Sequence, residues 1–126
     1  MRLNQVTVGS TNLERSERFY ETLGLTLIVK DDHYLRFECE DGHSTFSVES
    51  VAAVDPTEQV TVYFETDILD DEYERLARAG FEFEQPPTDM PWLWREARLR
   101  DPDGHHLCLF HAGPNRRTPP WRINPD

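Results

Sequence analysis

The chain repeats its own pattern halfway along, and this repeat constrains the fold more than any other feature. Residues 56 positions apart match in kind, as in Val6 and Val62, Leu13 and Leu69, Gly24 and Gly80, Leu25 and Phe81, and Leu27 and Phe83. After six extra residues in the second half, a separation of 62 places Asp41-Gly42-His43 on Asp103-Gly104-His105. Self-similarity at a fixed spacing indicates a duplicated structural unit. With 126 residues, the chain has room for two such small modules.

The hydrophobic pattern predicts the same order of elements in each half. In the first half, a strand at 3–8 precedes a helix at 13–23, which begins after the capping residues 10–12 and ends at Gly24. In the second half, an acidic segment at 67–72 opens a helix that ends at Gly80. The other strands are expected at 25–30, 34–39, 44–49, 60–65, 81–84, 96–100 and 106–111. The predicted fold class is α+β, with two tandem βαβββ modules.

The last predicted strand follows Asp-Pro-Asp-Gly at 101–104, a strong turn signal. Alternation along this strand places His106, Cys108 and Phe110 on one face, and Leu107 and Leu109 on the other. A cysteine at the centre of this strand raises the question of whether the chain is a metalloenzyme.

Charge excludes several classes of partner. The chain has 24 acidic and 13 basic residues, a formal net charge of -11. Such a surface repels nucleic acids and anionic membranes, and leaves neutral or cationic small molecules as partners. The two cysteines form no C-x-x-C motif, and no apolar run indicates a signal peptide or a membrane span. We therefore expect a cytoplasmic protein.

The duplicated unit resembles the vicinal oxygen chelate superfamily, which includes glyoxalase I, extradiol dioxygenases, fosfomycin-resistance thiol transferases and bleomycin-binding proteins. The matching landmarks are FYETLGL at 19–25 and LRDPDG at 99–104. The resemblance implies one domain at 1–112, with module one at 1–55 and module two at 56–112, and leaves an extended arm at 113–126. It also implies curled mixed sheets with helices on their convex sides, and a homodimer.

In metal-using members of this family, the first and last strands of each module supply the ligands. Residue by residue, the resemblance places these positions at Gln5, Phe46, Thr61 and Cys108. This set has no carboxylate for a hard ion and lacks three protein ligands suited to zinc. The sequence therefore predicts no metal and no catalytic residue, although a divalent ion with atypical ligands remains an alternative.

The predicted site lies on the concave faces of the two modules. Strand alternation adds neighbours to the four positions above, and Trp92 and Trp94 belong to an inserted segment that begins near residue 85. Aromatic side chains at such a site stack on planar ligands. The complete predicted ligand-binding set is Gln5, Thr7, Phe46, Thr61, Tyr63, Trp92, Trp94, His106, Cys108 and Phe110.

Three functions stay open at this stage. The first is a metal-independent protein that binds a small planar organic ligand. The second is a metal-dependent lyase, isomerase or dioxygenase with atypical ligands. The third is a metal-free enzyme that uses His106 or Cys108. The arm at 113–126 is expected to dock through Trp121 on its own domain or on a partner.

Overall fold

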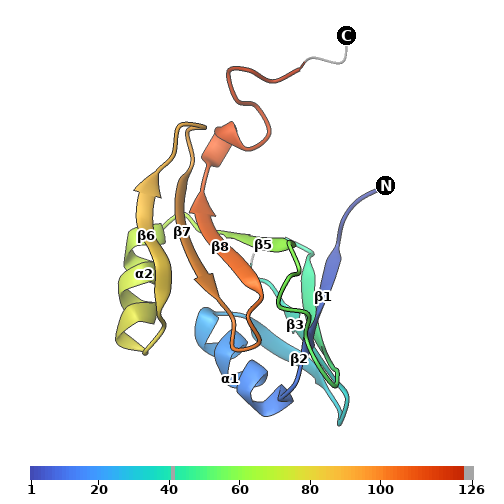
Figure 1. Cartoon of the computed structure of the whole chain (residues 1–126). Helices are drawn as coiled ribbons and strands as arrows, with labels where there is room; N and C mark the ends of the chain where they lie inside the picture. Colours follow the sequence, from blue (N-terminus) through green and yellow to red (C-terminus); the bar gives the residue numbers. More distant parts are fainter. Residues whose placement is uncertain (41, 124–126) are drawn as a thin grey trace. The chain divides into compact units, whose positions relative to one another are not determined.

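The computed structural model describes residues 1–40 and 42–123, which form two compact units (Figure 1). Unit 1 comprises Met1–Gln59 together with Asp101–His105. Unit 2 comprises Val60–Arg100 and the chain from His106 onward. Asp41 of the predicted Asp41-Gly42 turn and the last three residues of the predicted arm lie outside the described residues.

Unit 1 is a four-stranded mixed sheet with one helix. Its elements are β1 (Gln5–Ser10), α1 (Leu13–Leu23), β2 (Thr26–Lys30), β3 (Tyr34–Glu38) and β4 (Thr45–Ser50). The strand order is β1-β4-β3-β2, with β1 parallel to β4 and the other pairs antiparallel. The Asn12 side chain accepts a hydrogen bond from the Arg15 amide and begins α1, and Gly24 ends it at a φ of 124°.

Unit 2 repeats this order and confirms the predicted tandem βαβββ fold. Its elements are β5 (Thr61–Glu65), α2 (Leu69–Arg78), β6 (Phe83–Asp89), β7 (Arg95–Arg100), β8 (His106–His111) and the short 3-10 helix η1 (Gly113–Asn115). The strand order β5-β8-β7-β6 is the counterpart of that in unit 1. Across the described residues, no helix has the length and apolar character needed to cross a membrane.

Strand β6 extends further than the sequence predicts. The expected strand ended at residue 84, whereas β6 continues through Pro86 and Pro87 to Asp89. Its pairing with β7 shifts register twice along this stretch. Because β6 is the outer strand of its sheet, a proline there removes no hydrogen bond from a second neighbour. Part of the segment expected to be a loop is therefore an irregular edge strand.

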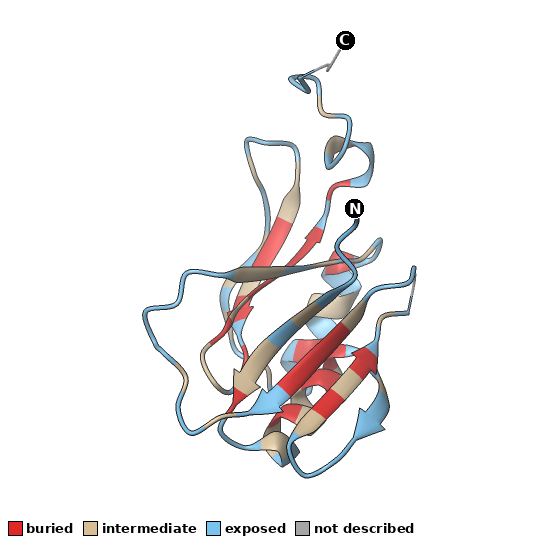
Figure 2. Ribbon diagram, turned by 90° about the vertical axis from the view of Figure 1, so that its right-hand side faces the viewer, coloured by how far each residue is buried: buried red, intermediate tan, exposed pale blue. Residues whose placement is uncertain are grey.

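Buried residues concentrate on the two inner strands of each sheet, β3 and β4 in unit 1 and β7 and β8 in unit 2 (Figure 2). In unit 1, the buried side chains of Leu35, Phe37, Phe46 and Val48 lie beneath α1. The counterparts in unit 2 are Ala97, Leu99, Leu107 and Leu109, which lie beneath α2. On the outer strands of the same faces, Val6, Val8, Val62 and Phe64 are half-buried. This arrangement confirms that the helices cover the apolar faces.

The predicted orientation of Phe46 is wrong. Phe46 pairs with Val6, is 2% exposed, and its ring centroid lies 4.6 Å from that of Tyr20 in α1. Six residues connect β3 to β4, but only five connect β7 to β8. The separation of equivalent positions therefore falls from 62 to 61 across this turn, so that Ser47, and not Phe46, corresponds to Cys108. A slip of one residue moves a side chain to the opposite face of a sheet.

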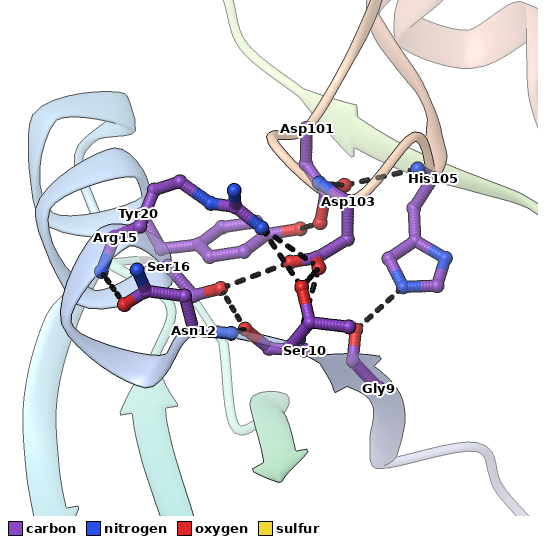
Figure 3. Close-up of polar contacts among 10 residues, drawn as sticks. Gly9, Ser10, Asn12, Arg15, Ser16, Tyr20, Asp101, Asp103 and His105 are labelled. Carbon is purple, nitrogen blue, oxygen red and sulfur yellow. Dashed lines mark hydrogen bonds and ion pairs between the residues drawn. The ribbon is translucent and has the colours of Figure 1, made fainter. Parts of the chain in front are cut away.

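The Asp101–His105 turn belongs to unit 1, where Asp103 forms a polar cluster at the start of α1 (Figure 3). The Asp103 carboxylate accepts hydrogen bonds from the Thr11 amide at 2.9 Å, the Thr11 hydroxyl at 2.8 Å and Arg15 at 2.9 Å. Burial alone would raise the pKa of Asp103, but these donors and the Arg15 charge outweigh burial and lower it. The turn therefore carries a stabilised negative charge beside the positive end of a helix.

Two further side chains of this turn are held in unit 1 (Figure 3). The Tyr20 hydroxyl donates to the Asp101 carboxylate at 2.6 Å, and both residues are buried. His105 Nε2 forms a hydrogen bond of 2.7 Å to the carbonyl of Gly9. The turn predicted from Asp-Pro-Asp-Gly is thus an anchored part of unit 1 as well as a connection between strands.

Candidate functional site

The face of the unit 2 sheet that points away from α2 collects most of the predicted ligand-binding residues. The strand register pairs Tyr63 with Cys108, Cys108 with Arg98, and Phe110 with Glu96, so these side chains share one face. We call this surface the unit 2 open face. It consists of Thr61, Tyr63, Trp94, Glu96, Arg98, His106, Cys108 and Phe110.

Three aromatic rings form a packed group on the unit 2 open face. Trp94 stacks on Phe110, with ring centroids 4.7 Å apart and an angle of 20° between the rings. Tyr63 meets both rings edge-on, at 5.7 Å from Phe110 and 6.0 Å from Trp94. Phe110 is buried, Trp94 is half-buried and Tyr63 is 45% exposed. The buried ring of Phe110 therefore anchors the group in the fold, and Tyr63 presents its exposed aromatic surface to solvent.

Glu96 is a buried residue of this face that the sequence reasoning missed. It is 1% exposed, and its two carboxylate oxygens have different partners. Trp92 Nε1 donates to one oxygen at 2.7 Å, and Arg98 Nη2 donates to the other at 2.9 Å. Its place was readable from β7, because the apolar Ala97 and Leu99 alternate with Glu96 and Arg98. Glu96 thereby fixes the indole of Trp92, which is 39% exposed in the turn between β6 and β7.

Arg98 connects this carboxylate to the aromatic group. Besides its ion pair with Glu96, it donates to the Tyr63 hydroxyl at 3.4 Å. Its guanidinium carbon lies 5.8 Å from the centroid of the Tyr63 ring, within the range of a cation–π contact. The pair carries no net charge, so the unit 2 open face has a neutral centre with aromatic sides.

Cys108 lies at the centre of this face, and its thiol is fully buried. Burial, followed by the nearby charge of Glu96, raises the pKa of Cys108 to about 12. Nucleophilic attack requires the thiolate, which is scarce at neutral pH when the pKa is this high. Cys108 packs with Phe110, Ala112 and Trp94, as a small apolar residue would.

His106 and Thr61 pair with each other on the same face, and both are half-buried. Within the described ranges 1–40 and 42–123, His106 makes no hydrogen bond or ion pair that would orient its ring. A general base needs such positioning in addition to a suitable pKa.

The corresponding face of unit 1 contains the remaining predicted residues, except Phe46. Gln5 and Thr7 lie on the predicted side of β1, away from α1. The Thr7 and Ser47 hydroxyls form a hydrogen bond of 2.5 Å, and Thr45 donates to Gln5 at 2.7 Å. Together with Tyr34 and Arg36 of β3, these residues make up the unit 1 open face. This face is polar where the unit 2 open face is aromatic.

The family resemblance implies a metal site on these strands, and such a site needs side chains that can ligate a divalent ion. With the corrected register, the four implied positions hold Gln5 and Ser47 in unit 1, and Thr61 and Cys108 in unit 2. Unit 1 provides an amide and a hydroxyl, and unit 2 provides a hydroxyl and a thiol, while the Glu96 carboxylate of unit 2 already accepts hydrogen bonds from Trp92 and Arg98. Among the described residues, no group of three or more His, Cys, Asp or Glu side chains is arranged to hold a metal ion. This donor set does not fit a divalent ion.

Solved structures with the same fold include several named for bleomycin. The bleomycin resistance determinant encoded on transposon Tn5 superposes with a TM-score of 0.76 at 20% identity, covering 88% of this chain and 98% of that chain. A bleomycin-binding protein in complex with bleomycin gives a TM-score of 0.72 at 20% identity, with the same coverage. A glyoxalase/bleomycin resistance protein/dioxygenase from Nocardioides gives 0.77 at 25% identity, covering 98% of this chain and 90% of that chain.

One protein-family model matches most of the chain. No curated protein sequence matches it. The sequence model of the Glyoxalase/Bleomycin resistance protein/Dioxygenase superfamily matches residues 2–109, which span both βαβββ units. The chain belongs to the Glyoxalase/Bleomycin resistance protein/Dioxygenase superfamily.

Proposed function

We propose that this chain is a binding protein whose unit 2 open face holds a small planar organic ligand by stacking, without a metal ion. The observation that carries the proposal is the stack of Trp94 on Phe110, with Tyr63 across both edges. A ring group that is already ordered loses little side-chain entropy when a ligand stacks on it. Tyr63 and Trp92, which are 45% and 39% exposed, add accessible aromatic surface in the same unit.

The polar groups on this face favour binding over catalysis. Cys108 is held as a thiol, and Glu96 is occupied by Trp92 and Arg98. Neither group is free to move a proton or to attack a substrate. A metal-dependent lyase or dioxygenase, the main alternative, would need ligands that these positions do not provide.

The net charge of -11 and the neutral centre of the face both favour a neutral or cationic ligand. Bleomycin is the first probe to test, because two proteins with this fold are named for bleomycin resistance or binding. The ion pair beneath the rings would orient polar groups of the ligand, while the rings supply most of the contact area.

Calorimetric titration with bleomycin, and with ethidium as a smaller planar cation, tests the proposal. We expect Trp94→Leu to weaken binding by about tenfold, the value of one aromatic stacking contact. Trp121→Phe is the matched control, since Trp121 lies in the C-terminal segment and is 56% exposed. The proposal fails when neither probe binds the wild type, or when Trp94→Leu binds both probes as well as Trp121→Phe does.

We also propose that the protein acts as a twofold homodimer. The outer strand β2 exposes Ile28 and Val29, and an exposed apolar edge strand favours pairing with another chain. Light scattering at micromolar concentration should give twice the chain mass of 14.8 kDa. A mass of one chain would exclude the dimer.

A further inference from the structure

One strand arginine lacks the carboxylate partner that its counterparts have. Among the basic residues of the strands, Lys30, Arg95, Arg98 and Arg100 each form an ion pair. Arg36, on β3, forms none within residues 1–40 and 42–123. The chain has 24 acidic residues for 13 basic ones, so potential partners are abundant. Arg36 as a whole residue is half-buried, and a bound anion would supply the counter-ion that its charge lacks.

The guanidinium of Arg36 is already oriented. Its Nε donates to the Tyr34 hydroxyl at 3.0 Å, and its central carbon lies 5.3 Å from the centroid of the Tyr34 ring. Its two terminal amino groups make no hydrogen bond to the described part of the chain. These two groups form the fork that binds a carboxylate through two parallel hydrogen bonds.

The hydroxyl and amide side chains beside Arg36 are rich in hydrogen-bond donors. Hydrogen bonds from Ser47, Arg36 and Gln5 to Tyr34, the largest from Ser47, lower the pKa of the Tyr34 hydroxyl despite partial burial. These contacts stabilise negative charge at the Tyr34 oxygen. Two carboxylates share this face: Glu38 lies two residues after Arg36 on β3, and Glu49 is the cross-strand partner of Tyr34. Both are exposed, and neither forms an ion pair with Arg36.

We propose that the unit 1 open face binds the carboxylate of a small organic acid, with Arg36 gripping both oxygens and Tyr34 donating a further hydrogen bond. The proposal stands independently of the one for unit 2, because none of its residues belongs to that unit. The negative charge of the whole protein does not prevent binding, since charges more than about 10 Å away are largely screened at physiological salt. The ligand carboxylate is therefore attracted mainly by the Arg36 guanidinium, with which it is in direct contact.

Titration with benzoate, followed by calorimetry and amide chemical shifts, tests this site. We expect benzoate to bind the wild type, and benzamide, its neutral analogue, to bind at least tenfold more weakly. Arg36→Gln should lose at least tenfold in benzoate affinity. Arg18→Gln is the matched control: it removes the same charge from an exposed position of α1 and should bind as the wild type does.

Circular dichroism will establish that Arg36→Gln folds as the wild type does, and Tyr34→Phe provides a second variant with an expected smaller loss. Unchanged benzoate affinity in Arg36→Gln, or an equal loss in Arg18→Gln, overturns the site. Tighter binding of phenyl phosphate, with the same dependence on Arg36, overturns its assignment to a carboxylate. Trp94→Leu should leave benzoate binding unchanged, which separates this result from the test of the unit 2 open face.

Discussion

The two units place an arginine at the same position of their sheets, yet the two arginines have different surroundings. Arg98 is paired with the buried carboxylate of Glu96, two residues earlier on β7. At the position equivalent to Glu96, unit 1 has Tyr34, so Arg36 meets a hydroxyl in place of a carboxylate. The difference between Glu96 and Tyr34 at this one position therefore decides whether the arginine charge is neutralised inside the fold or remains available to a ligand.

The opposite faces of the two sheets differ much less. Phe46 and Val48 of unit 1 correspond to Leu107 and Leu109 of unit 2, and all four are buried. Apolar burial against the helix is the same physical requirement in both units. The faces away from the helices differ in chemistry: unit 2 buries Cys108 and Phe110 there, whereas unit 1 has the polar Ser47 and Arg36.

The largest expected effect is on stability, when each arginine is replaced by methionine. Arg98→Met should cost about 3 kcal/mol, because it leaves the carboxylate of Glu96 buried without its cation. Arg36→Met should cost less than about 1 kcal/mol, since no buried carboxylate depends on Arg36. Urea unfolding of both variants at pH 7 measures the difference.

The two variants differ in what they leave behind: Arg98→Met leaves the buried Glu96 carboxylate without its cation, whereas Arg36→Met leaves no buried carboxylate unpaired. Equal costs for the two arginine variants at pH 7 would show that the Arg98–Glu96 pair has no special role in stability.

A smaller effect is expected at the centres of the two faces. Cys108→Ser places a hydroxyl among Phe110, Ala112 and Trp94 and should cost about 1–2 kcal/mol. Ser47→Ala should cost less than about 1 kcal/mol, because its partner Thr7 is exposed and can turn to water. Thermal unfolding of both variants checks this order. A Cys108→Ser variant as stable as the wild type would contradict the apolar surroundings assigned to the thiol.

The smallest effect concerns the ionisation of Tyr34. Its pKa is lowered by hydrogen bonds from Ser47 and Arg36, so Arg36→Gln should raise it towards the ordinary value for tyrosine. Spectrophotometric titration of the difference between wild type and Tyr34→Phe isolates this group. Arg98→Gln is the control and should leave the Tyr34 titration unchanged. A shift as large in Arg98→Gln as in Arg36→Gln would contradict a local cause.

The sequence predicted the fold well because local signals agreed with the tertiary structure. The Asn12 cap and Gly24 define α1 at the predicted residues, and alternation defines β8 at its predicted residues. The extent of β6 was missed because prolines usually end a strand, and their tolerance depends on lying at a sheet edge. Position at an edge depends on strand order, which a local pattern does not contain.

The candidate site was predicted in part. Alternation correctly placed Gln5, Thr7, Tyr63 and Cys108 away from the helices. Phe46 was assigned to the wrong face because a separation of 62 residues was assumed on both sides of the two Asp-Gly turns. The β3–β4 connection is in fact one residue longer than the β7–β8 connection. The apolar pair Phe46 and Val48 was the signal that would have corrected the register.

The Glu96–Arg98 pair was missed for a different reason. Charged residues near a turn are usually solvated, and the burial of Glu96 depends on Trp92, which reaches back from the neighbouring turn. Such a contact exists only once the hairpin has formed. Alternation indicates which face of β7 carries Glu96 and Arg98, but the burial of Glu96 and its ion pair were visible only in the folded chain.

The central claim is that the unit 2 open face is an aromatic binding surface and not a metal site. Elemental analysis of protein purified without chelators tests this most directly. We expect less than about 0.1 equivalent of any transition metal, because the described residues provide no set of three protein ligands suited to one. Stoichiometric zinc, iron, nickel or manganese that disappears in Gln5→Ala or Cys108→Ala would contradict the account and support a metalloenzyme.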